Sequence, residues 1–126
     1  KTVGRRYHGE SQGAEPGRVS GWILSLDADK DLQDIFLYTA QTWGEPQARN
    51  YVEDLFGLFG SIGLNPKMGR ARDELGEGIR SFPHASHVIF FMEWQGETAI
   101  LRVLHGSRDV DAAFAGFDPV ANFSED

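Results

Sequence analysis

The sequence predicts an α+β domain in which a helical hairpin covers one antiparallel sheet. Two observations carry this prediction. In the first half of the chain, apolar residues recur at helical spacing in two consecutive segments that meet near Gly44. In the second half, three short runs rich in Val, Ile, Phe and Trp are separated by turn-forming residues. Because these runs are apolar on both faces over much of their length, they need a helical cover on at least one side.

The first expected elements are a strand over residues 20–26 and the helix that follows it. Trp22 and Leu24 lie on one face of this strand, because alternate residues of a strand share a face. At the start of the helix, either Asp27 or Asp29 would cap the free N–H groups and complement the helix dipole. The apolar stripe of the helix comprises Leu32, Ile35, Phe36, Thr39 and Trp43. This stripe is the face that we expect to cover the sheet.

A second helix is expected directly after Gly44, which is the natural C-terminal stop of the first. Pro46 fits the first turn of this helix, where its missing N–H has no partner to lose. Its apolar stripe comprises Ala48, Tyr51, Val52, Leu55, Phe59 and Ile62. The short connection predicts an antiparallel hairpin. Gly57 and Gly60 either weaken the last turns before Gly63 or permit close backbone approach by a partner.

The second half of the chain predicts an antiparallel meander of three strands. The expected strands are Ile79–His84, His87–Trp94 and Glu97–His105. Turn-forming residues separate them, Pro83–Ser86 between the first two and Gln95–Gly96 between the last two. Alternation along the middle strand places Phe90 and Phe91 on opposite faces of the sheet.

We expect one folded domain over residues 20–114, flanked by two terminal segments. A chain of 126 residues is large enough for a single core and too short for two. Residues 1–19 contain four glycines and almost no large aliphatic residue, which predicts a flexible extension that the domain does not need. Residues 115–126 form an acidic tail, in which Phe117 and Phe123 would dock back on the domain.

The composition argues against several classes of function. The formal net charge is −7, and residues 20–105 alone carry seven basic and twelve acidic groups. Since nucleic-acid binders gain affinity from clustered Lys and Arg, we expect no direct nucleic-acid binding by the chain alone. The absence of cysteine removes disulfides and thiolate chemistry. No run of 18 uncharged apolar residues occurs, so we expect no membrane span, and the chain suits the cytoplasm.

Six segments of the chain, taken together, resemble the ParE branch of the RelE/ParE toxin superfamily. They lie between Gly21 and Phe114, in the order and at the spacing of that family. The segments are Leu26–Ile35, Trp43–Ala48, Asn65–Arg70, Gly78–Pro83, Val88–Phe91 and Ile100–Asp109. One departure from the family pattern is Phe91, which stands where a tyrosine is common.

The resemblance implies the toxin half of a bacterial type II toxin–antitoxin pair, with a RelE/ParE-like fold. Toxins of this branch bind DNA gyrase, trap it on DNA and block replication, and a ParD-type antitoxin holds them inactive. The resemblance therefore implies a protein–protein inhibitor with no catalytic residue, no cofactor and no metal. An inactive relative that acts only with its antitoxin, as a repressor complex, is a further hypothesis.

Two groups of residues are candidates for these contacts. The cations expected near the strand ends would bind gyrase, and they are Arg80, Arg102, His105 and Arg108. Large apolar side chains, more than one stripe can bury, would line a groove for a disordered, amphipathic segment of the antitoxin. These side chains are Trp22, Leu24, Trp43 and Phe56.

The alternative is a ribosome-dependent mRNA endoribonuclease of the RelE type. Such an enzyme needs a general base, a general acid and cations around the phosphate. The chain offers these parts near the strand ends, namely Arg80, His84, His87, Arg102, His105 and Arg108, with Glu93 as a carboxylate. Against this alternative, the C-terminal part lacks a tyrosine and the acidic charge repels RNA. The same residues have structural explanations. Arg102 would pair with Glu93 across the hairpin, and His84 and His87 lack an evident third metal ligand.

Overall fold

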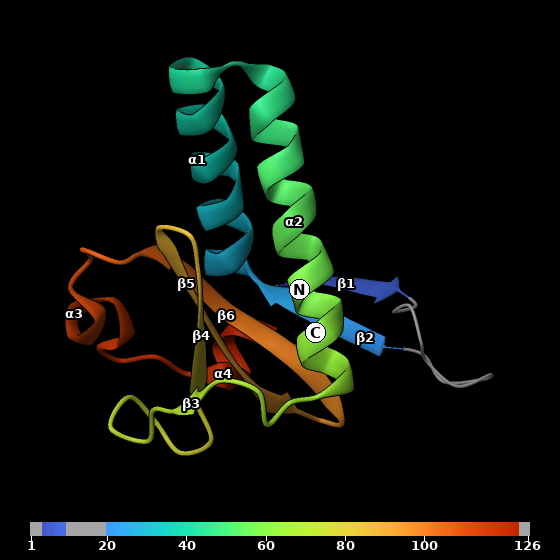
Figure 1. The fold of residues 1–126 in the computed structure, drawn as a ribbon. Coiled ribbons are helices and arrows are strands. Elements are labelled where there is room, and N and C mark those ends of the chain that lie inside the picture. Colours follow the sequence, from blue (N-terminus) through green and yellow to red (C-terminus); the bar gives the residue numbers. More distant parts are fainter. Residues whose placement is uncertain (1–3, 10–19, 124–126) are drawn as a thin grey trace.

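A mixed sheet of six strands carries the helical hairpin on one face (Figure 1). The computed structural model describes residues 4–9 and 20–123. In chain order the elements are β1 (Gly4–Gly9), β2 (Ser20–Ser25), α1 (Leu26–Trp43), α2 (Glu45–Leu64), β3 (Arg70–Ala71), β4 (Arg80–His84), β5 (His87–Trp94), β6 (Glu97–His105), α3 (Val110–Phe114) and α4 (Pro119–Phe123). The strand order in the sheet is β1-β2-β6-β5-β4-β3. The predicted α+β class is confirmed.

Helices α1 and α2 form the predicted antiparallel hairpin, and one glycine joins them. Gly44 has a φ of 100°, in the region that favours glycine, and it ends α1 as expected. The N-cap of α1 is Ser25, whose Oγ accepts a hydrogen bond from the N–H of Ala28. The predicted cap at Asp27 or Asp29 is therefore wrong, because the hydroxyl at the end of β2 reaches the free N–H first.

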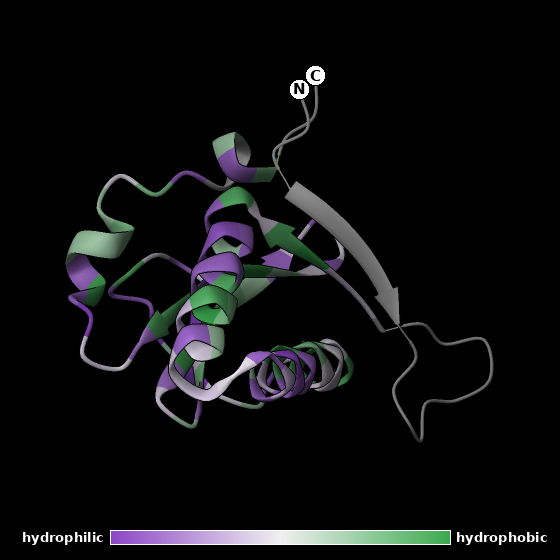
Figure 2. Cartoon of the chain, turned by 90° about the horizontal axis from the view of Figure 1, so that it is seen from above, coloured by the Kyte–Doolittle hydropathy of each residue, from purple (hydrophilic) through white to green (hydrophobic). Residues whose placement is uncertain are grey.

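The face of the hairpin toward the sheet forms the larger apolar core. Hydrophilic and hydrophobic residues alternate along both helices, as expected for helices with one buried face (Figure 2). The buried members of this core are Trp22, Leu24, Ala28, Leu32, Ile35, Leu55, Phe59, Ile62, Ile89, Phe91, Ile100 and Val103. Trp43, which the predicted stripe included, is 65% exposed, because the joined ends of the two helices extend past the sheet (Figure 1).

The three central strands follow the predicted meander, but the sheet is not a simple meander. β4 pairs antiparallel with β5, and β5 with β6. β2 lies on the other side of β6 and pairs with it in parallel, with Trp22 opposite Thr98 and Leu24 opposite Ile100. A parallel neighbour requires a long connection, which the helical hairpin and the strands β4 and β5 supply here.

A bulge in β6 changes which of its side chains share a face. Phe90 lies opposite Arg102 and Phe91 lies opposite Ile100, so one extra residue, Leu101, stands between the two pairs. Strict alternation would place residue 103 with Leu101 on one face. Instead Val103 joins the core under the hairpin, and Leu101 belongs to the core on the opposite face.

Both edge strands lie in segments for which the sequence predicted no strand. Residues 4–9, expected to be part of a flexible extension, form β1 and pair antiparallel with β2. The rest of that predicted extension lies outside the described residues. β3 lies between α2 and β4, where the sequence predicted no strand, and pairs antiparallel with β4. Pairing at a sheet edge uses backbone hydrogen bonds, so it needs no apolar pattern in the sequence. That the domain does not need residues 1–19 stays a prediction.

The second face of the sheet has an apolar core of its own, which α3 and α4 complete. Its buried members are Ile23, Ile79, Phe90, Ala99, Leu101, Leu104, Phe114 and Phe123. The ring of Phe123 lies 6.2 Å from that of Trp94, and the ring of Phe117 lies 5.6 Å from that of Phe114. The predicted docking of the tail aromatics is confirmed, and the core extends past residue 114.

Phe123→Ala should lower the free energy of unfolding by about 3 kcal/mol, because it empties a buried aromatic site beside Trp94. Phe117→Ala is the matched control, since Phe117 is only half-buried and its loss should cost clearly less. Urea unfolding followed by tryptophan fluorescence measures both values. Equal and small effects would show that α4 adds no stability to the sheet.

Candidate functional site

The guanidinium of Arg102 is bound inside the fold, to a carboxylate of α1. Its Nε and Nη2 donate to the two oxygens of Asp31 at 2.8 and 2.9 Å, and the Arg102 side chain is 13% exposed. The hydrogen bonds to Asp31 raise the pKa of Arg102, against burial, which lowers it. Arg102 does not pair with Glu93, as one interpretation expected, because Glu93 lies further along β5, opposite Thr98.

Arg80 begins β4, opposite Phe91 in the middle of β5, and holds the loop that follows α2. Its Nη2 donates to the carbonyl oxygens of Lys67 and Gly69 at 3.0 and 2.8 Å. Its Nε is buried and has no hydrogen-bond partner among the described residues. The side chain also borders a cavity of about 630 Å³ beside Met92 and Glu93. The structure therefore separates Arg80 from the other predicted cations.

Three histidines meet at the opposite end of the sheet, under a tyrosine of α2. His84, His87 and His105 face one another in register on β4, β5 and β6. The rings of His87 and His105 are 5.6 Å apart, and the ring of Tyr51 lies 5.6 Å from both His84 and His87. The Tyr51 hydroxyl lies 2.7 Å from Nδ1 of His87 and 3.4 Å from the carbonyl oxygen of His84. We call these four residues the histidine cluster.

Burial and neighbouring imidazoles keep the centre of the histidine cluster uncharged. The pKa of His87 is lowered, first by burial and then by the proximity of His105 and His84, while Asp31 acts in the opposite direction. Burial also raises the pKa of Tyr51. At neutral pH the imidazole of His87 is therefore uncharged, and it shares a hydrogen bond with the Tyr51 hydroxyl.

The turn after β6 places Arg108 on the surface at this same end of the sheet. His105 is exposed, and its Nδ1 accepts a hydrogen bond from the N–H of Ser107 at 3.1 Å. The N–H of Arg108 donates to the carbonyl oxygen of His105 at 2.9 Å, which folds the turn back on the strand. Of the four predicted target-binding residues, the structure brings His105 and Arg108 together as exposed groups. The guanidinium groups of Arg102 and Arg80 instead make hydrogen bonds that hold parts of the fold together.

Two important residues of this region, Asp31 and Tyr51, were not predicted as site residues. Asp31 is 8% exposed and lies one turn after Ala28 on the buried face of α1. A carboxylate on an apolar stripe is the signal that the sequence offered, since a buried charge needs a partner. Tyr51 was assigned to the apolar stripe of α2, and only the fold shows that its hydroxyl reaches β5.

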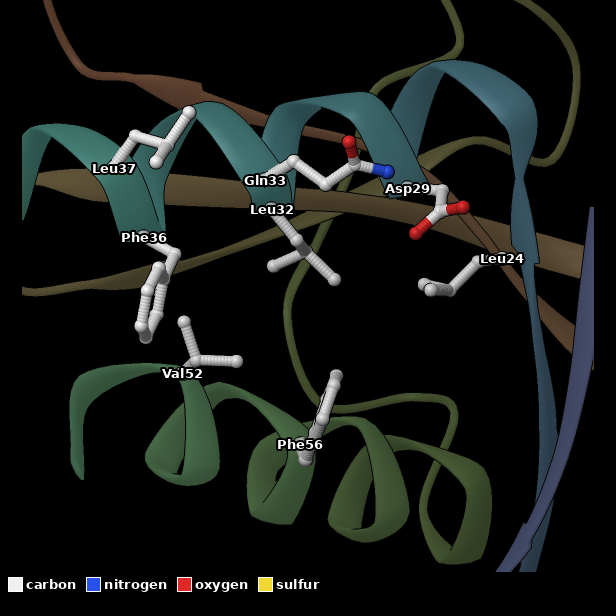
Figure 3. Close-up of a pocket in the computed structure, with 8 residues that line it drawn as sticks. All are labelled: Leu24, Asp29, Leu32, Gln33, Phe36, Leu37, Val52 and Phe56. Carbon is white, nitrogen blue, oxygen red and sulfur yellow. The ribbon is translucent and has the colours of Figure 1, made fainter. Parts of the chain in front are cut away.

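An apolar groove lies between α1 and α2, beside the end of β2 (Figure 3). It encloses about 410 Å³ and is lined by Leu24, Asp29, Leu32, Gln33, Phe36, Leu37, Val52 and Phe56. Phe36 and Val52 point toward each other from the two helices, and Leu37 is 57% exposed at the rim (Figure 3). We call this surface the hairpin groove.

The structure brings together part of the set predicted to bind an antitoxin. Leu24 and Phe56 line the hairpin groove, although Leu24 is fully buried. Trp22 lies behind the groove, with its ring 5.5 Å from that of Phe56 and 5.0 Å from that of Phe59. Trp43, at the end of α1, does not line the groove.

Among residues 4–9 and 20–123, no three His, Cys, Asp or Glu side chains adopt an arrangement that would hold a metal ion. The imidazoles of the histidine cluster are therefore neighbours without a shared coordination centre. Within the same ranges, no helix is long and apolar enough to cross a membrane.

Comparison with known proteins identifies the family. Residues 23–110 match the family described as the ParE toxin of the type II toxin–antitoxin system parDE. This chain belongs to the ParE toxin family. Toxin ParE1 of Mycobacterium tuberculosis is 36% identical over 93 residues, which cover 73% of this chain and 95% of that protein. Toxin ParE1 of Caulobacter vibrioides is 37% identical over 89 residues, which cover 71% and 92%.

A more distant ParE and a solved structure agree with this assignment. Toxin ParE of Escherichia coli is 27% identical over 93 residues, covering 73% of this chain and 90% of that protein. A structure described as the chromosomal ParDE TA system from P. aeruginosa matches with a TM-score of 0.56 and 20% identity. It covers 65% of this chain and 90% of that one, and it shows a shared fold. The resemblance inferred from the sequence is confirmed.

The ParE match covers the helical hairpin and the central strands of the sheet. The match begins in β2 and ends at the first residue of α3. The hairpin groove, the Asp31–Arg102 pair and the histidine cluster all lie inside these limits. Strand β1 and helix α4 lie outside them.

Proposed function

We propose that this ParE-family toxin inhibits DNA gyrase by protein–protein binding in the cytoplasm, and that a ParD-type antitoxin neutralises it. The observation that carries the proposal is the family match over residues 23–110, together with relatives named Toxin ParE1 that are 36–37% identical. The action is binding without catalysis. It requires no cofactor, no metal and no direct contact with nucleic acid before gyrase has bound.

The surface around His105 and Arg108 is the proposed gyrase-binding face. Both residues are exposed, and they share the end of the sheet where β6 turns toward α3. Residues 20–105 carry seven basic and twelve acidic groups, so long-range attraction for nucleic acid is weak. A few exposed cations then act by local fit to a protein surface. Arg102 supports this face indirectly, by fixing β6 on Asp31, whereas Arg80 holds the loop after α2, away from this face.

The RelE-type endoribonuclease is the second candidate, and one observation favours it. The imidazoles of His87 and His105 and the hydroxyl of Tyr51 lie within reach of one another, a set that can act in acid–base catalysis. Tyr51 supplies the tyrosine that the C-terminal part of the sequence lacks. The centre of this set is half-buried, however, and the guanidinium of Arg102 is already bound to Asp31.

Purified gyrase should lose supercoiling activity when this protein is added, and cleaved DNA should accumulate. Arg108→Ala should weaken the effect at least tenfold, because an exposed cation at a binding face acts through its contact with the partner. Arg70→Ala is the matched control, an exposed arginine on β3 at the far edge of the sheet. It should leave the effect unchanged. Codon-specific cuts in translated mRNA with unaffected gyrase would instead establish the endoribonuclease.

We further propose that an amphipathic segment of the antitoxin binds in the hairpin groove. The groove is lined mainly by apolar side chains and is open at Leu37. A disordered segment that folds on binding would bury this surface, as in other helix-in-groove complexes. Of the predicted residues, Phe56 offers a direct contact, Leu24 forms the floor, and Trp22 supports Phe56 from behind.

Phe56→Asp should weaken antitoxin binding at least tenfold, because it places a charge in an apolar groove. Tyr38→Asp is the control, since Tyr38 is 67% exposed on α1 and does not line the groove. Leu24→Asp is unsuitable, because Leu24 is fully buried and the variant would unfold. Isothermal calorimetry with an antitoxin fragment measures the affinities, and circular dichroism verifies folding. Equal affinity of Phe56→Asp and the parent would place the antitoxin elsewhere.

A further inference from the structure

The histidine cluster joins α2 to the sheet at the point where the hairpin leaves it. The ring of Tyr51 packs on those of His84 and His87, and the ring of His87 packs on that of His105, with ring centres 5.6 Å apart in each pair. Tyr51 packs against the edge of the apolar core under the hairpin, and its hydroxyl makes a polar contact between α2 and this end of the sheet. The seating of this part of α2 therefore depends in part on imidazoles that can gain a proton near neutral pH.

The charged groups around the cluster give little compensation for added protons. On α2, Asp54 lies near Tyr51 and is exposed. On α1, Asp31 is the acid that faces His87, but its oxygens already accept three hydrogen bonds, two from Arg102 and one from the N–H of Val103. The strands contribute the imidazoles of His84 and His105 beside His87, and β6 also contributes Arg102, whose guanidinium is bound to Asp31.

We propose that the histidine cluster makes the seating of α2 on the sheet dependent on pH, so that acidification through the titration range of histidine loosens α2 from this end of the sheet. Two protonated imidazoles in ring contact repel each other, and a half-buried one also loses hydration. Tyr51 directly precedes Val52, which lines the hairpin groove, so a shift at the cluster also changes the groove.

The direction of the effect follows from the protonation of each state. The folded chain lowers the pKa of His87 below its usual value of 6.5, so the unfolded chain binds more protons in that range. This part of the stability is complete above pH 6.5 and is lost as the pH falls toward the lower pKa of the folded state. Tyr51 stays protonated throughout, because its pKa is raised.

Thermal unfolding of the full chain between pH 7.5 and 5.5 tests the proposal, since most carboxylates keep their charge over this range. The melting temperature of the parent should fall by roughly 3–6 °C. His87→Phe, which keeps a ring beside Tyr51 but cannot titrate, should show less than half of this fall. His105→Gln removes an exposed neighbour and should also reduce it, and this variant decides the outcome if His87→Phe does not fold. His8 is the remaining histidine of the chain, and His8→Gln should show the same decrease in melting temperature as the parent.

Nuclear magnetic resonance shows whether α2 responds. The backbone amide signals of Tyr51 and Val52 should shift with the same midpoint as the His87 imidazole, below pH 6.5. The proposal is overturned if both cluster variants keep the full fall in melting temperature. It is also overturned if His87 titrates in the parent while the amide signals of Tyr51 and Val52 do not shift. Neither measurement involves gyrase or an antitoxin, so the outcome does not depend on the proposed function.

Discussion

The carboxylate of Asp31 is the charged group on which the arrangement of helices and sheet depends. It accepts two hydrogen bonds from Arg102 and one from the N–H of Val103, all between 2.8 and 3.0 Å. The pairing of β2 with β6 ends at Leu24 and Ile100, so the next part of this edge of β6 has no strand beside it. Ser25 and Asp31 bind the backbone groups of β6 there. The Ser25 hydroxyl donates to the carbonyl oxygen of Leu101, and the Asp31 carboxylate accepts from the N–H of Val103. Removing one partner of such a buried pair costs about 3–5 kcal/mol.

This attachment explains why the proposed functional surfaces lie where they do. With the start of α1 fixed on β6, the hairpin groove opens between α1 and α2 beside the end of β2, and Tyr51 of α2 comes to lie over the histidines. The bulge at Leu101 turns Val103 toward the hairpin, and the N–H of Val103 then reaches Asp31. The exposed residues His105 and Arg108 follow two and five residues after Val103, at the end of β6 and on the turn to α3.

The sequence predicted the elements whose side chains carry a periodic signal. The bounds of β5 and β6, the glycine that ends α1 and the buried face of α2 all follow from apolar periodicity and turn residues. Strand β1 and the parallel pairing of β2 were missed. Pairing at a sheet edge depends on backbone hydrogen bonds, and parallel pairing depends on a long connection, so neither leaves a periodic pattern of side chains. The site was predicted only in part. Arg102 was taken either as a target-binding cation or as a partner of Glu93, since nothing near it in the chain reveals a partner 71 residues away.

A double-mutant cycle on Asp31 and Arg102 tests most directly whether this pair fixes the hairpin on the sheet. Asp31→Ala, Arg102→Ala and the double variant are compared with the parent by urea unfolding, and the interaction energy is the departure from additivity. The account predicts a coupling of about 1.5–3 kcal/mol, because both groups are buried and joined by two short hydrogen bonds. A coupling below about 0.5 kcal/mol would contradict it, and would show that apolar packing alone seats the hairpin.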